Sequence, residues 1–110
     1  MSLGHVEVKG ATLASAATLS AEVNLTKAYR DVFVEVPTIA SASTMYIQAA
    51  SELGGTFRRI VELAAGVEVE VEITSPSNKM VRIPAGLRNL KIELTSAPSA
   101  AVEFKVIAGN

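Results

Sequence analysis

The chain has no cysteine and no tryptophan, and it has one histidine, His5, among its 110 residues. Without cysteine, a disulfide framework, a thiolate nucleophile and a zinc ribbon are excluded. His5 stands close to the amino end, where nothing in the sequence predicts that it is held in place as the base of a catalytic triad. A Gly-rich phosphate loop, a GxSxG motif and an HExxH motif are also missing. We therefore expect a protein that is not an enzyme and that uses no metal and no cofactor.

An excess of charge of either sign is also missing. Ten Lys and Arg residues face eleven Asp and Glu residues, which gives a formal net charge of -1. Binding to nucleic acid or to an anionic membrane surface needs a basic excess, so neither is expected as a partner. The chain also has no apolar run near the roughly 20 residues that span a membrane. Its amino end lacks the basic and apolar regions of a signal peptide, so we expect synthesis in a cytosol.

Hydrophobic residues make up 49% of the chain, whereas aromatic residues make up only 5%. A core built mainly from Val, Ile, Leu and Ala suits β-sheets that pack face to face. The length corresponds to one domain. Apolar and polar residues alternate with a period of two in most of the chain, and turn residues separate the alternating runs. We expect about eight or nine short strands, at residues 5–9, 21–25, 32–36, 44–50, 56–63, 67–73, 80–83, 90–95 and 102–106. This spacing predicts an antiparallel sandwich or barrel.

Two of these predictions depend on assigning faces. Residues 56–63 fit both a helical and a strand pattern, and we expect a strand because glycines bracket too short a stretch for a helix. In residues 67–73 the aliphatic side chains are expected to point inward and Glu68, Glu70 and Glu72 outward. A single row of carboxylates along a strand has neither the facing geometry of a glycosidase nor the converging oxygens of a calcium site. We expect these glutamates to pair with Arg or Lys on a solvated face, with a weak metal or partner contact as the alternative.

The first twenty residues contain few large side chains. Residues 11–21 are rich in Ala, Ser and Thr, and Leu13 and Leu19 are their only large apolar residues. We expect an extended arm at residues 1–20 and a single β-sandwich domain at residues 21–110. The alternating residues 5–9 would form a short strand, or an arm that becomes a strand on a partner.

Several exposed-face residues are candidates for a contact. Arg59 shares a face with Phe57 and Val61 if its segment is a strand, so it needs a carboxylate partner or a subunit interface. Four further residues offer a sugar or protein contact, although aromatic residues beside β-branched ones usually serve packing. They are Tyr29, Phe33, Tyr46 and Arg88.

Strand and turn segments of the chain occur in a specific order and spacing. These segments lie at residues 12–14, 19–25, 32–37, 44–51, 54–59 and 87–92, and a final apolar strand follows. The order resembles a family of small virion structural proteins of tailed bacteriophages and prophages, over about residues 10–109. The chain departs from the family pattern, which often has Asp where Glu52 or Leu53 stands and a glycine pair where Thr26 and Lys27 stand.

The resemblance implies an antiparallel β-sandwich of jelly-roll type that serves as a capsid decoration or cement protein. It implies a location on the capsid surface of the virion after synthesis in the host cytoplasm. Its partners would be the major capsid protein or another virion protein, and further copies of itself, with a trimer favoured. The alternative is a tail or fibre-base component that binds a carbohydrate or a receptor. The residues expected to contact a partner are His5, Val6, Val8, Leu13, Arg59 and Arg88.

Overall fold

The chain folds as an all-β protein in a computed structural model that describes residues 6–39, 44–74, 76–84 and 86–110. These residues form eleven strands and no helix, and so no helix in them could cross a membrane. The strands are β1 (Val6–Leu13), β2 (Val23–Asn24), β3 (Asp31–Val36), β4 (Thr44–Ala50), β5 (Arg58–Arg59), β6 (Val61–Ala64), β7 (Val67–Glu70), β8 (Glu72–Thr74), β9 (Lys79–Ile83), β10 (Asn89–Leu94) and β11 (Val102–Gly109). The predicted all-β class is confirmed.

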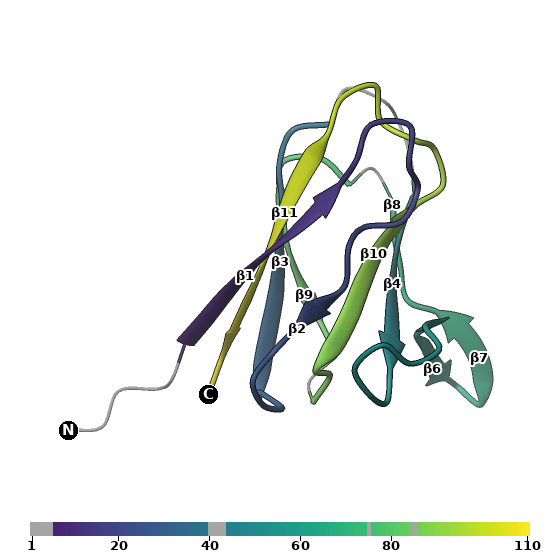
Figure 1. The fold of residues 1–110 in the computed structure, drawn as a ribbon. Helices are drawn as coiled ribbons and strands as arrows, with labels where there is room; N and C mark the ends of the chain where they lie inside the picture. The colour runs from purple at the N-terminus through teal and green to yellow at the C-terminus, as the bar shows by residue number, and fades with distance from the viewer. Residues whose placement is uncertain (1–5, 40–43, 75, 85) are drawn as a thin grey trace.

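Two antiparallel sheets pack against each other (Figure 1). One sheet has the order β1-β11-β3-β9. The other has the order β2-β10-β4, and β5 and β8 both pair with the remaining edge of β4. The strand pairs are nested, because β1 pairs with β11, β2 with β10, β3 with β9 and β4 with β8. This nesting is that of a jelly roll, and it confirms the predicted sandwich of jelly-roll type.

The core lies between the sheets and consists of the inward residues of alternating strands. Pro37 follows the last residue of β3, as expected for a residue that cannot donate a ladder hydrogen bond. Aliphatic residues predominate, in line with the low aromatic content. The buried residues of the central strands are Val32, Val34, Val36, Met45, Ile47, Leu90, Ile92, Leu94, Phe104, Val106 and Ala108.

The arm predicted for residues 1–20 is not an arm over residues 6–20, and the domain does not begin at residue 21. All eight residues of β1 pair with β11, and Ala11 and Leu13 are fully buried. Residues after β1 also bond to the sandwich, through Ser20 N to Ile92 O at 2.9 Å and Leu94 N to Thr18 O at 2.8 Å. Small side chains do not weaken this segment, because they let it lie close to β10 and β11. Residues 1–5 lie outside the described part of the chain.

The single inward-facing strand predicted for residues 67–73 is also wrong. The chain divides there into β7 and β8, and Val67 and Val69 are exposed. The strand predicted for residues 56–63 is found from Arg58 on, but it divides into β5 and β6 at Ile60. These divisions account for a strand number above the predicted eight or nine. Their physical cause is a hairpin that leaves the sandwich.

Candidate functional site

The β6–β7 hairpin is inserted into an edge strand of the second sheet without disturbing its register. On β4, Ala49 and Gln48 pair with Arg58 and Arg59 of β5. Ile60 N then donates to Ile47 O at 3.0 Å, and Tyr46 pairs with Glu72 of β8. Residues 60 and 72 therefore take successive positions along β4. Residues 61–71 leave the edge between them, and Val71 N closes the base by donating to Ile60 O at 2.9 Å.

The hairpin stands apart from both sheets (Figure 1). It exposes aliphatic side chains. Leu63 is 76% exposed and Val67 is 62% exposed, and Val61 and Val69 are also exposed. Ala65 and Gly66 form its turn with φ of 52° and 82°, the backbone of a tight hairpin turn. An isolated two-stranded hairpin is marginally stable in water. Its exposed apolar residues make it the strongest candidate contact surface in the described part of the chain.

Arg59 fixes the hairpin to the sandwich. Its Nε and Nη2 donate to the two carboxylate oxygens of Glu93 at 2.9 and 2.6 Å, and Nη1 donates to Glu70 of β7 at 3.2 Å. The guanidinium lies 3.8 Å from the ring centroid of Tyr46, which is stacking distance. The hydrogen bonds from Arg59 lower the pKa of the Glu93 carboxyl, and those to Glu93 and Glu70 raise the pKa of Arg59. Arg59 thus has the carboxylate partner that the sequence required of it.

The glutamate row is divided between different environments. Glu70 pairs with Arg59, and Glu72 accepts a hydrogen bond from the Tyr46 hydroxyl at 3.2 Å. The ion pair of Glu70 with Arg59 matches the prediction that these glutamates pair with Arg or Lys, whereas Glu72 bonds to a tyrosine. Within the described ranges, no cluster of His, Cys, Asp or Glu could hold a metal ion.

A second apolar surface lies on the first half of β1, at the edge of the first sheet. Val6 is 64% exposed and Val8 is 55% exposed, and both point to the outer face of the sheet beside β11. Among the described strands, none pairs with the other edge of β1. Leu13, at the end of the same strand, is fully buried, so the prediction that it contacts a partner is wrong. The reason is that the first half of β1 is exposed to solvent, whereas its second half lies in the core.

The exposed first half of β1 is fastened by Glu7. Its carboxylate accepts hydrogen bonds from Tyr29 Oη at 2.7 Å, from Thr26 Oγ1 at 2.8 Å and from Thr26 N at 3.0 Å. These bonds, the one from Tyr29 foremost, lower the pKa of Glu7 to about 2. Burial raises the pKa of Tyr29, which is only 1% exposed. This network connects β1 to the loop between β2 and β3.

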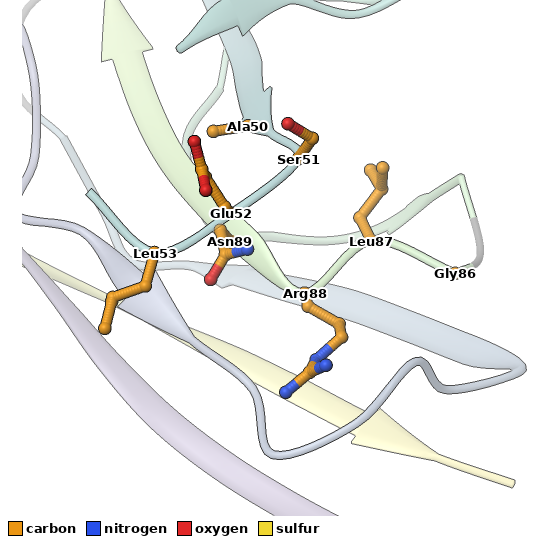
Figure 2. Close-up of a pocket in the computed structure, with 8 residues that line it drawn as sticks. All are labelled: Ala50, Ser51, Glu52, Leu53, Gly86, Leu87, Arg88 and Asn89. Atoms are coloured by element: carbon orange, nitrogen blue, oxygen red, sulfur yellow. The ribbon is translucent and has the colours of Figure 1, made fainter. Parts of the chain in front are cut away.

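Arg88 borders an open pocket of about 480 Å³. Figure 2 shows that the lining residues come from two segments, residues 50–53 after β4 and residues 86–89 before β10. The Arg88 side chain points away from Glu52 in this view, and its Nη2 donates to Thr26 O at 3.1 Å. Arg88 therefore supports the β2–β3 loop and is not paired with the acidic residue of the pocket.

The aromatic residues do not form an open sugar platform. Tyr29 is buried in the core, and the Tyr46 ring lies under the Arg59 guanidinium. Phe33 is half-buried on the outer face of the first sheet, where it pairs with Ile107. These three rings lie in different parts of the fold. The structure therefore does not gather them with Arg88 into one contact surface.

The predicted contact residues occupy separate places. Val6 and Val8 share one exposed face of β1, Arg59 lies on the second sheet, and Arg88 lies at one end of the sandwich. His5 lies outside the described residues. Sequence reasoning missed the aliphatic residues of the β6–β7 hairpin, because it placed Val67 and Val69 in the core. The signal that could have found the hairpin is Ala65-Gly66 between two alternating runs.

Comparisons with known proteins are informative about the fold. No family model matches the chain, and no curated protein matches its sequence. Among solved structures, the chain is similar to the crystal structure of the SPBc2 prophage-derived protein YomS, with a TM-score of 0.70 and 14% sequence identity. The match covers 100% of this chain and 97% of YomS. The two proteins share the fold over nearly the whole of both chains.

Proposed function

We propose that this chain is a non-enzymatic structural protein of a tailed-phage virion, and that it binds the head surface as a decoration or cement protein. The observation that carries the proposal is the whole-length similarity of its jelly roll to a prophage-derived protein. The order of strand and turn segments in the sequence supports the same family.

The distribution of surface features also supports binding to other proteins. The exposed apolar residues of the β6–β7 hairpin and of β1 lie on strands at the edges of the fold. The pocket beside Arg88 is partly open to solvent, whereas small-molecule sites usually enclose most of their ligand. Exposed apolar patches on a folded domain mark protein–protein contacts.

The test is binding to separated heads and tails of the phage that encodes the chain, prepared from a mutant that lacks its gene. Purified protein is added, and bound protein is measured after sedimentation through a density gradient. We expect saturable binding to heads, and a rise in the temperature at which the heads release DNA. Heads from the unaltered phage are the matched control, because their sites are already filled.

Binding to tails alone would replace the head assignment with the tail or fibre-base alternative. Binding to neither particle would overturn the virion proposal. A glycan-binding screen separates the receptor-binding form of the alternative, with Tyr46→Ala as a variant that removes the aromatic ring under Arg59.

A further inference from the structure

We propose that copies of this chain associate head to tail, with the β6–β7 hairpin of one copy added as a strand pair to the free edge of β1 in the next. This contact between copies does not depend on the place of the protein in a virion. Two surfaces at different ends of the fold carry it.

The hairpin offers both backbone and apolar groups that have no partner among the described residues of the same copy. In the described part of the chain, β6 and β7 pair only with each other, so each has an outer edge with open N–H and C=O groups. Val61 and Leu63 are exposed on one face of the hairpin, and each is paired with a glutamate of β7. Val67 and Val69 are exposed on the other face, where they are paired with an alanine and a glutamate of β6. A strand edge that pairs with the hairpin would supply hydrogen bonds and cover these side chains.

The first half of β1 offers the matching surface. Its outer edge pairs with no described strand, and Val6 and Val8 expose more than half of their surface. The exposed segment, residues 6–10, has nearly the same length as the four-residue strands β6 and β7. Pairing over this length leaves the buried part of β1, with Ala11 and Leu13, undisturbed in the core.

Charge favours a contact between unlike surfaces over a contact between like ones. Residues 61–71 contain Glu62, Glu68 and Glu70 and no Lys or Arg. Two hairpins placed against each other would therefore bring like charges together. A hairpin placed against β1 meets cationic side chains instead.

The cations around β1 come from three segments. Lys9 is on β1 itself, Lys105 of β11 is paired with Gly10, and Lys27 lies 5.4 Å from the ring of Tyr29, which bonds to Glu7. The Glu7 carboxylate is occupied by its bonds to Tyr29 and Thr26. Its Oε2 also lies 3.6 Å from Lys9 Nζ, so Lys9 is partly neutralised within its own copy. Glu103 lies beside Gly10, at the end of the exposed segment nearer the core.

The contact is heterologous, because it joins two different surfaces of the same chain. Such contacts generate closed rings when the rotation between copies closes, and open filaments when it does not. Each copy contributes one hairpin and one β1 edge, so a copy that lacks either surface can still engage one neighbour. This property gives the proposal a specific test.

The test uses two full-length variants and measures mass by sedimentation equilibrium. Leu63→Glu with Val69→Glu adds like charge to both faces of the hairpin, and Val6→Glu with Val8→Glu does so on β1. All four positions are exposed, so the fold is expected to persist, which far-UV circular dichroism checks. Met80→Glu is the matched control, because Met80 is an exposed apolar residue on β9, the opposite edge of the first sheet.

We expect the unaltered chain and the Met80→Glu variant to form species of several times the 11.5 kDa chain mass. Each double variant alone should be a monomer. An equimolar mixture of the two should form a heterodimer, because the intact hairpin of one meets the intact β1 edge of the other. That heterodimer cannot grow further.

Three outcomes overturn the proposal. The first is an unaltered chain that stays monomeric up to its solubility limit, which would leave the hairpin to a different protein. The second is a hairpin variant that still self-associates, which would point to a symmetric contact through β1. The third is a mixture of the two variants that remains monomeric while the unaltered chain associates.

Discussion

Glu7, which bonds β1 to the β2–β3 loop, also makes the stability of the fold depend on pH. Its folded-state pKa of about 2 lies below the ordinary value of 4.5, so its charged form is favoured by folding. The stabilisation that follows is fully present above pH 4.5 and is lost as the pH falls from 4.5 towards 2. Glu93, whose pKa is also lowered, adds to the same acid sensitivity.

We predict that Glu7→Gln lowers the stability of the chain near neutral pH, since the amide replaces a charged acceptor for Tyr29 and Thr26. The difference between the unaltered chain and the variant should shrink as the pH falls through 4.5 and should vanish near 2. Urea unfolding at a series of pH values measures it. A difference that is independent of pH would contradict the role given to the Glu7 charge.

Leu13 and Val8 lie on the same strand, but only Leu13 belongs to the core. Because its side chain is fully buried, we predict that Leu13→Ala lowers the free energy of unfolding by about 2–5 kcal/mol. Val8→Ala, on the same strand but exposed, should change it by less than about 0.5 kcal/mol. Denaturant unfolding of both variants checks the pair, and similar losses for the two would place Val8 in the core as well.

At the scale of single elements, one side chain adds to the backbone bond that closes the base of the β6–β7 hairpin. Arg59 bonds to Glu70 on the hairpin and to Glu93 on β10, so it connects the hairpin to the second sheet. We predict that Arg59→Gln speeds amide hydrogen exchange in β6 and β7 and leaves exchange in β10 and β11 nearly unchanged.

Arg58→Gln is the matched control, because Arg58 is exposed and makes no ion pair with any described residue. Arg59→Lys should give an intermediate result, since a lysine cannot make the bidentate bond to Glu93. Equal exchange in the hairpin of all three variants would show that the strand pairing alone holds it.

A second prediction for the hairpin follows from the register of its flanking residues along β4. Because residues 60 and 72 take successive positions on β4, a chain without residues 61–71 keeps the alternation of Ile60 inward and Glu72 outward. We predict that this deletion variant keeps a cooperative unfolding transition and well-dispersed amide signals in NMR spectra. Loss of the folded state on deletion would mean that the hairpin is part of the sandwich and not an insertion in it.

At the scale of the whole molecule, the two ends of the chain complete one sheet together. β1 covers one edge of β11, and Ala11 and Leu13 of β1 lie in the same core as Phe104. A chain that starts at residue 14 would expose the β11 edge and open the core. We predict that it is unfolded or aggregates, as seen by circular dichroism and light scattering.

A chain that starts at residue 6 is the control for this truncation. It keeps all eight pairs between β1 and β11, so we expect its unfolding transition to match that of the full chain. If the chain starting at residue 14 were folded and monomeric, β1 would instead be a dispensable arm.

The sequence by itself determined the strands of the central sandwich and the composition of the core. The alternation at residues 32–36, 90–94 and 102–106 predicted which side chains are buried, because neighbouring strands on both sides impose one inward face. The absence of cysteine and the small share of aromatic residues determined that this core is aliphatic. Proline and glycine placed the ends of several strands.

Only the tertiary structure decided where alternation means burial and where it does not. Residues 67–70 alternate as cleanly as β3, but they lie in a hairpin with no sheet on either side, so Val67 and Val69 are exposed. Residues 11–13 look weakly apolar, but β11 lies beside them and Leu13 is buried. The period of two reports the strand geometry of one segment, whereas burial depends on pairing with segments far away in the chain.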